Sequence, residues 1–237
     1  MSLLELRQVS KWQRRGSRRL EVLREVSLEI ESGELVAVWG LRRSGRSTLL
    51  TVAAGIDQPD SGTVLFEGKA LNTRGAGGLG HGIGYCHQVG APNGRRVIDN
   101  VRAGMLGRSV AVPAAYSLAH KALERVGAEG CAELALGDLD AAEAVRVAIA
   151  SALVLGPRLL VIDEPTKGVD LLDRDDLVLL LRSLANEGIA VLVSDADGSG
   201  LSDADRTLSL AGGELRGRTA PQLGGTLVPL SRRNTAA

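Results

Sequence analysis

Aromatic residues, cysteines and long apolar runs are all scarce in this chain of 237 residues. Aromatic side chains make up only 2% of it, so a core has to be built mainly from Leu, Val, Ile and Ala. Cys86 and Cys131 lie far apart and outside any metal-ligand spacing, which predicts reduced thiols in a cytoplasmic protein. The sequence has no run of the roughly 20 apolar residues that span a bilayer and no apolar signal-peptide segment, so we expect membrane contact only through a partner.

A net charge is also missing, because 28 acidic and 28 basic residues balance. A chain without net charge has no overall field that attracts nucleic acid, so we expect no nucleic-acid partner. Hydrophobic residues make up 44% and charged residues 24%, which is ordinary for a globular protein. The length favours one large α/β domain, or one domain with an inserted subdomain.

Short, continuously apolar runs predict buried strands of a parallel sheet at 34–39, 159–162 and 189–193. Alternating or β-branched segments predict further strands at 3–9, 63–66 and 206–210. Helical patterns begin at Ser47, cover 171–186 and dominate 97–152. We expect a basic turn at 11–19, a Gly-rich loop at 75–84 and a loose tail at 216–237. Strands that alternate with helices imply a mainly parallel sheet flanked by helices, with 97–152 as an inserted helical subdomain.

A phosphate-binding loop is predicted between the strand at 34–39 and the helix that follows it. The spacing is that of a Walker A motif, G-x-x-x-x-G-K-[ST], with Arg46 in the lysine position. Two glycines let the backbone wrap a phosphate closely, and the N–H groups at the start of the helix point at the anion. Ser47 is expected to place its hydroxyl on Mg²⁺. The predicted nucleotide-binding residues of this loop are Gly40, Leu41, Arg42, Arg43, Ser44, Gly45, Arg46, Ser47 and Thr48. The alternative is a plain glycine turn between strand and helix.

Arg46 keeps the positive charge of the usual lysine but changes its shape. A guanidinium is a wide planar fork, whereas an ammonium is a compact point charge that fits inside the loop. Arg46 can reach the phosphates by a different path, or it can crowd the loop and weaken turnover. Arg42 and Arg43 either add charge at the rim or are solvated surface residues.

Two acidic residues follow the apolar run at 159–162, in the pattern of a Walker B strand with a following glutamate. Asp163 at the strand end is expected to orient Mg²⁺, usually through water. Glu164 is expected to polarise the attacking water or accept its proton. The alternative is an acidic turn that ends the strand by chance.

Further segments stand in a fixed order around these two motifs. Segments 3–11 and 22–30 precede the loop, while Gly84-Tyr-Cys-His-Gln88, 97–101, 146–150 and Pro165-Thr-Lys-Gly-Val-Asp170 follow it. Together with the two motifs they resemble the ATP-binding subunits of ABC transporters, from about residue 3 to about residue 215. The spacing is similar to that of the lipoprotein-releasing and macrolide-exporter ATPases.

The resemblance implies a fold, ligands and partners. The fold is a P-loop NTPase, a single ABC-type domain over 1–237, with an antiparallel N-terminal β part. The ligands are ATP and Mg²⁺. The partners are transmembrane permease subunits and a homologous ATPase subunit, in a homodimer or a heterodimer. The location is the cytoplasmic face of the cell membrane, to which the partners hold the protein.

The resemblance also implies roles for single residues. Gln88 matches the Q-loop glutamine, which senses Mg²⁺ or water and faces the membrane partner. Asp170 matches an aspartate at the dimer seam. Trp12 lies near the position of the aromatic that stacks on adenine, but Gln13 stands in the usual position. Trp12 is therefore either that aromatic, one residue out of register, or a surface residue packed on the sheet.

Besides Arg46, the chain departs from the family in two further motifs. Asp140, Ala141 and Ala142 stand where the signature has a serine and two glycines that meet the γ-phosphate of the partner's ATP, and a carboxylate there repels phosphate. Asp195 stands where a histidine normally touches the γ-phosphate, and an ionised acid cannot donate that hydrogen bond. By their positions in the family motifs, the candidate catalytic residues are Glu164, Gln88 and Asp195.

Three functions remain open from the sequence. The chain is the ATPase subunit of an ABC transporter, with hydrolysis that is slow or confined to one site of an asymmetric dimer. Alternatively, it is a non-catalytic nucleotide-binding subunit paired with an active homologue, as Asp140 and Asp195 suggest. A soluble ABC-type ATPase in repair, chromosome or translation work is disfavoured, because the chain has no coiled-coil insert and no basic nucleic-acid face.

Overall fold

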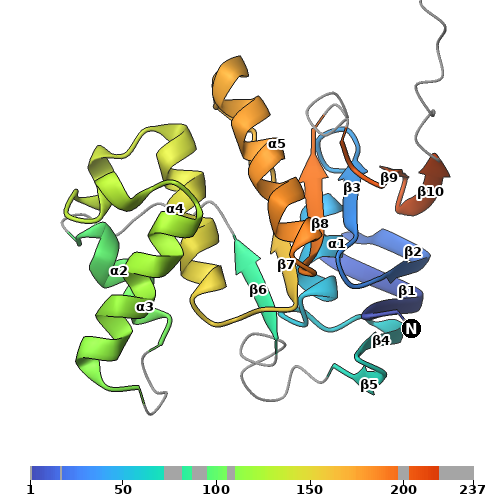
Figure 1. Ribbon diagram of the computed structural model, residues 1–237. Coiled ribbons are helices and arrows are strands. Elements are labelled where there is room, and N and C mark those ends of the chain that lie inside the picture. The colour runs from blue at the N-terminus through green and yellow to red at the C-terminus, as the bar shows by residue number, and fades with distance from the viewer. Residues whose placement is uncertain are drawn as a thin grey trace, which may run out of the picture.

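The computed structural model describes residues 2–16, 18–71, 82–86, 95–105, 110–196 and 203–218. In this part of the chain two β-sheets and a set of helices pack into one body (Figure 1). Gln88, most of the expected loop at 75–84 and the tail beyond residue 218 lie outside the described residues. Their predicted roles stay predictions.

The larger sheet contains six of the described strands, in the order β10, β9, β3, β8, β7, β6. Their bounds are β3 Leu35–Trp39, β6 Ile83–Cys86, β7 Leu159–Ile162, β8 Ala190–Asp195, β9 Arg206–Ala211 and β10 Glu214–Arg218. All neighbouring pairs are parallel except β9 and β10, which form an antiparallel hairpin. The mainly parallel sheet predicted from the sequence is therefore confirmed.

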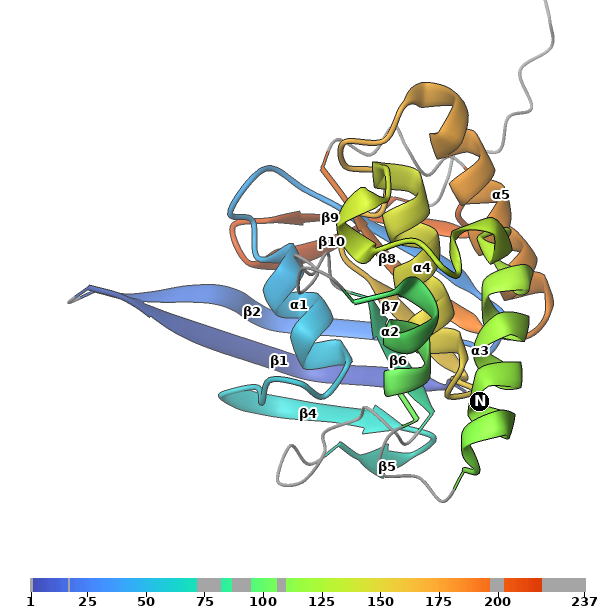
Figure 2. The ribbon, with the colours of Figure 1, turned by 90° about the vertical axis from the view of Figure 1, so that its left-hand side faces the viewer.

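The smaller sheet is antiparallel, with the strand order β2, β1, β4, β5. Its strands are β1 Leu4–Arg15, β2 Arg18–Ile30, β4 Ser61–Phe66 and β5 Lys69–Ala70. The turn predicted at 11–19 is shorter than expected: of the described residues in that segment only Gly16 is a turn residue, because 11–15 belong to β1 and 18–19 to β2 in a long hairpin that projects from the body (Figure 2). The basic composition suggested a longer turn, but the cross-strand pairs continue to Arg14 with Arg19 and Arg15 with Arg18.

Two further expectations fail near strand ends. Gly84 belongs to the short strand β6, although the sequence placed it in a loop. The tail predicted from residue 216 begins later, because β10 pairs with β9 up to Arg218. In both cases sheet pairing overrides a local composition that disfavours strands.

The helices fall into two groups. Helix α1 (Arg46–Ala53) contacts β7 and β8 on one side and β1 and β2 on the other. Helix α5 (Leu171–Asn186) packs on β3 and β8. A separate helical block stands beside α5 in Figure 1. Its elements are α2 Val97–Ala103, α3 Val112–Arg125, the 3₁₀ turns Glu129–Cys131 and Leu136–Asp138, and α4 Ala141–Leu153.

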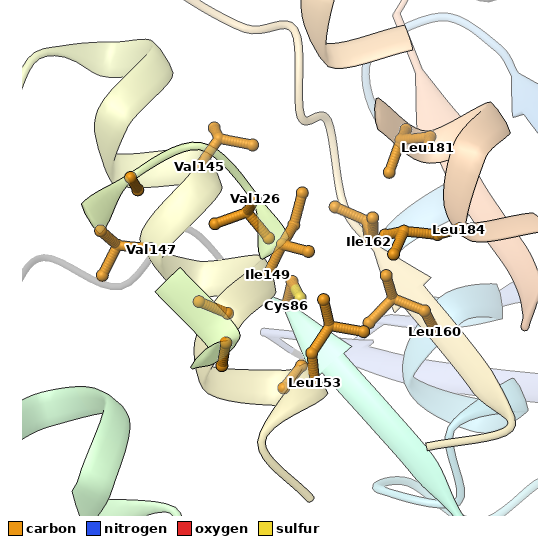
Figure 3. Close-up of a cluster of buried hydrophobic side chains, with 14 of the residues drawn as sticks. Cys86, Val126, Val145, Val147, Ile149, Leu153, Leu160, Ile162, Leu181 and Leu184 are labelled. Atoms are coloured by element: carbon orange, nitrogen blue, oxygen red, sulfur yellow. The ribbon is translucent and has the colours of Figure 1, made fainter. Parts of the chain in front are cut away.

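The central strands β3, β7 and β8 of the larger sheet are buried on both faces, which explains why they read as largely unbroken apolar runs. In β3, Leu35 and Ala37 face the cluster beneath α4 and α5, while Val36 and Val38 face the cluster around α1 and the smaller sheet. Figure 3 shows the first cluster, where Leu160 of β7 meets side chains of α4 and α5. The sheet is thereby a rigid support for the loops at its carboxyl edge.

Neither cysteine takes part in a disulfide. Burial raises the pKa of the Cys86 thiol to about 12. Burial and a hydrogen bond to Glu143 raise the pKa of Cys131 to about 11. Both groups therefore stay protonated thiols near neutral pH. None of the described helices is both long and apolar enough to cross a membrane.

Candidate functional site

The predicted phosphate loop joins the carboxyl end of β3 to the first residue of α1. Gly45 is the N-cap of α1, with φ at 106°, a conformation that L side chains rarely adopt. A Cβ on Gly45 would lie 2.7 Å from the carbonyl oxygen of Val22, and one on Gly40 would lie 2.4 Å from that of Leu210. The structure therefore requires glycine at both positions, as the motif predicts.

A cavity of about 430 Å³ opens beside this loop. One wall is formed by Leu41 and residues 43–48 of the loop, and the other by side chains of the β1–β2 hairpin. The hairpin residues are Gln13, Arg14, Leu20 and Val22. A helix N-terminus with its N–H groups unpaired in the helix forms the floor, which suits an anion. Gly40 and Arg42 of the predicted set do not line this cavity.

Arg46 lies at the inner end of the cavity and is only 6% exposed. Its Nη1 donates hydrogen bonds to the backbone oxygen of Gly40 and, at 2.5 Å, to that of Asp195. Its Nη2 donates to Oε1 of Glu164 at 2.5 Å. The guanidinium thus joins the start of the phosphate loop to the ends of two neighbouring strands.

The two predicted carboxylates follow β7 and are both half-buried. Ser194 of β8 holds them together: its hydroxyl donates to Oδ1 of Asp163 at 2.5 Å and accepts the backbone N–H of Glu164 at 2.9 Å. Glu164 has φ at 49°, an uncommon value for a residue with a side chain. Burial and the charge of Asp163 raise the pKa of Tyr85 to about 12, so the neighbouring phenol stays protonated.

Asp195, predicted in the γ-phosphate switch position, ends β8 beside the phosphate loop. Its backbone pairs in register with Trp39, the last residue of β3. Oδ1 of Asp195 accepts the backbone N–H of Ala196 at 2.7 Å, and the residue is 5% exposed. Asp195 therefore lies beside the phosphate loop, whereas its predicted place at the γ-phosphate and its catalytic role stay predictions.

Asp140, in the signature position, caps helix α4. Its Oδ1 accepts the backbone N–H of Glu143 at 2.8 Å, and the Glu143 carboxylate accepts the backbone N–H of Asp140 at 2.9 Å. This reciprocal pair is a capping box, which an aspartate forms as well as a serine. Ala141 is exposed, whereas Ala142 is buried in the helical core.

Replacing Asp140 with alanine is expected to lower the free energy of unfolding by about 1 kcal/mol, because the N-cap acceptor is lost. Asp140→Ser should keep it within a few tenths of a kcal/mol. Urea denaturation measures both values, and Asp138→Ala removes an exposed carboxylate nearby as a control. An alanine variant as stable as the native chain would contradict the capping role.

Two other predicted residues lie apart from the phosphate loop. Asp170 is the exposed N-cap residue of α5, so it is accessible to a partner subunit. Trp12 lies under the guanidinium of Arg19, whose central carbon is 4.8 Å from the ring centre. Gln13 lines the cavity, whereas Trp12 does not, and the Gln13 side chain donates to Oγ1 of Thr48 at 2.9 Å. A role for Trp12 in stacking on adenine stays a prediction.

The residues that the sequence did not single out are Ser194 and Arg14. Ser194 precedes Asp195 at the end of a predicted strand, and nothing in the sequence around it indicates that its hydroxyl contacts Asp163 and Glu164. Arg14 was assigned to a turn, and only the extended hairpin brings it to the cavity.

The loop fits a bound phosphate, and the nearby oxygens fit Mg²⁺. In the described part of the chain, Oγ of Ser44 is buried without a hydrogen-bond partner, so its hydroxyl can donate a hydrogen bond to a phosphate oxygen. Ser47 and Asp163 offer hydroxyl and carboxylate oxygens, the ligands that Mg²⁺ prefers. The described ranges hold no group of three or more His, Cys, Asp or Glu side chains that could bind a metal ion. Mg²⁺ usually takes one or two protein ligands and completes its shell with water and substrate phosphates.

Comparisons with known proteins agree with this geometry. The model of the ABC transporter family matches residues 23–167. The chain is 36% identical over 222 residues to the lipoprotein-releasing system ATP-binding protein LolD of Myxococcus xanthus, a match that covers 91% of this chain and 99% of that protein. It is 29% identical over 226 residues to the macrolide export ATP-binding/permease protein MacB of Escherichia coli K12, covering 90% of this chain and 34% of MacB. The fold is similar to that of MJ0796, a bacterial ABC transporter cassette solved as a dimer, with a TM-score of 0.83, 25% identity and coverage of 92% of this chain and 98% of that one.

Proposed function

Since this chain belongs to the ABC transporter family, as one of its ATP-binding subunits, we propose that it binds MgATP beside residues 40–48 and hydrolyses it, at a rate limited by Arg46, Asp140 and Asp195. The observation that carries the proposal is the meeting of three groups at one sheet edge. The phosphate loop, Asp163 and Glu164 come from segments more than 100 residues apart, and Ser194 and Arg46 connect them by hydrogen bonds.

The phosphates of ATP would be held by the backbone N–H groups at the start of α1, with Ser44 and Arg46 as side-chain donors. Ser47 and Asp163 would hold Mg²⁺, directly or through water. When bound, Mg²⁺ supplies positive charge that offsets the charge of the phosphate oxygens. Glu164 would accept a proton from the attacking water, because its carboxylate stands next to Asp163 at the same strand end.

The names of the relatives support a proposal for the partners. LolD is named as part of a lipoprotein-releasing system, and MacB joins an ATP-binding part to a permease in one protein. We infer that this chain pairs with a second ATPase subunit, through a face that includes Asp170, and docks on separate permease subunits at the cytoplasmic face of the membrane. MJ0796, which was solved as a dimer, supports the pairing. The helical block at 97–152 and the Q-loop residue Gln88 are the proposed contacts with the permease.

A binding experiment tests this function. MgATP at about 100 times its dissociation constant should stabilise the protein by about 2.7 kcal/mol and raise its melting temperature by several degrees. AMP serves as the matched control, because it has the same base and sugar but lacks the β- and γ-phosphates. No rise with MgATP at millimolar concentration, in a protein that is folded by circular dichroism, would refute the proposal.

A non-catalytic subunit is the second candidate. The ion pair of Glu164 with Arg46 favours it, since the expected base is engaged by a cation, and the carboxylate of Asp140 favours it as well. In that case a reconstituted pair with an active homologue keeps its hydrolysis rate when this chain carries Glu164→Gln. Loss of all hydrolysis in that pair would exclude the second candidate.

A further inference from the structure

The contacts of Arg46 are unusual for a residue expected to bind a phosphate. Three hydrogen bonds tie its guanidinium to protein acceptors, and the Arg46 side chain is 7% exposed. Two of the acceptors are backbone oxygens, of Gly40 and Asp195, and the third is the carboxylate of Glu164. The positive group that should meet a phosphate is thus paired with the carboxylate that should activate water.

The ion pair connects the start of α1, which is expected to bind phosphate, with the residue after β7 that is expected to activate water. Arg46 begins α1, and Glu164 follows β7, 118 residues later in the chain. The side chain of Glu164 is 23% exposed and is also 3.1 Å from Nζ of Lys167, which is far more exposed. Arg46 is less exposed to solvent than Lys167. Water and salt therefore screen the attraction between Arg46 and Glu164 less than the attraction between Lys167 and Glu164.

We propose that Arg46 is a positioning residue that holds Glu164 while the phosphate loop is empty and releases it when phosphate arrives. The inference rests on the proposed binding of nucleotide. A phosphate in the loop and the carboxylate of Glu164 compete for the same buried guanidinium, and the two anions repel each other. Nucleotide binding therefore has to break the ion pair between Arg46 and Glu164, which lowers the apparent affinity for nucleotide. As a result, Glu164 leaves Arg46 only when a phosphate binds in the loop.

The arginine is what makes this arrangement possible. Its planar fork places Nη1 on two carbonyl oxygens while Nη2 reaches the carboxylate. A lysine in the same position has one nitrogen on a flexible stem, so it cannot hold three acceptors in these directions. Arg46→Lys should therefore loosen Glu164 while keeping a positive charge for phosphate.

A double-mutant cycle with Arg46→Lys and Glu164→Gln tests the proposal. Glutamine keeps the shape of Glu164 but removes its charge, so its bond to Arg46 is weaker. Isothermal titration with MgADP, which is not hydrolysed, should show Glu164→Gln tightening binding about tenfold in the native background, a change of about 1.4 kcal/mol. In the Arg46→Lys background the same substitution should change the dissociation constant less than about twofold. A general effect of the lost charge would instead appear equally in both backgrounds and would overturn the proposal.

Thermal unfolding without nucleotide gives an independent readout. Glu164→Gln should lower the melting temperature by about 2–4 °C in the native background and by less in the Arg46→Lys background. Equal effects in both backgrounds would also refute the pairing. If all four proteins show the coupled melting temperatures but none binds MgADP, the nucleotide function fails while the Arg46–Glu164 pair stands. If all four bind MgADP with additive effects, the function stands and the proposal fails.

Discussion

Replacing Glu164 with glutamine is expected to lower the rate of ATP hydrolysis by about a hundredfold or more. An amide keeps the size of the carboxylate but cannot accept a proton from water, and a positioned general base contributes 10²–10⁴-fold. The measurement is the release of inorganic phosphate at saturating MgATP, where differences in nucleotide affinity do not affect the rate. The comparison is therefore independent of the tighter binding expected for the same variant.

The matched control is Glu187→Gln, which removes an exposed carboxylate paired with Arg125 after the end of α5. This variant should hydrolyse ATP at the native rate. A Glu164→Gln protein with at least half the native rate would show that this chain does not use Glu164 as its base.

Removing the hydroxyl of Ser194 is expected to cost about 2–3 kcal/mol of folding free energy. Ser194 is 0% exposed, and its hydroxyl is both the donor to Asp163 and the acceptor for the N–H of Glu164. Alanine in its place leaves two half-buried polar groups without this partner, and an unsatisfied buried group costs about 1–3 kcal/mol, more when it is charged. Urea denaturation of Ser194→Ala measures the loss.

Ser209→Ala is the control for this variant. Ser209 lies in β9 of the same sheet, is half-buried, and donates one long hydrogen bond of 3.4 Å to the backbone oxygen of Arg216. Its loss should change stability by less than about 0.5 kcal/mol, as for most surface substitutions. Similar losses for both variants would mean that Ser194 does not hold the two acidic residues in place.

Ser194→Ala should also raise the Mg²⁺ concentration needed for nucleotide binding, because Asp163 loses the hydroxyl that donates a hydrogen bond to it.

The three departures from the family motifs have different structural settings. Asp140 forms a capping box at the start of α4, so its carboxylate has a local structural use. Arg46 is buried in an ion pair with Glu164. Asp195 accepts a hydrogen bond from the next backbone N–H and offers its carbonyl oxygen to Arg46. Each of the three residues therefore makes hydrogen bonds within the free subunit.

Local pattern was enough to predict the core elements of the fold. The unbroken apolar run at 159–162 predicts β7, and 171–186 coincides with α5, because burial on both faces of a sheet or on one face of a helix is written in the spacing of side chains. The two glycines of the phosphate loop were predicted in the same way, since a positive φ or a close backbone contact restricts the residue type wherever it occurs.

The tertiary structure alone decided how far the hairpin runs and which groups meet. Four arginines of the predicted turn are in strands because β1 and β2 pair with each other, Arg14 with Arg19 and Arg15 with Arg18. Arg46 meets Glu164 and Asp195 across 118 and 149 residues of chain, and Ser194 meets Asp163 across 31. Spacing along a chain reports the neighbours within one element, whereas contacts between strand ends depend on the order and register of the sheet. The sequence therefore determined which chemical groups were present, and the sheet determined that the positive and negative ones are paired with each other.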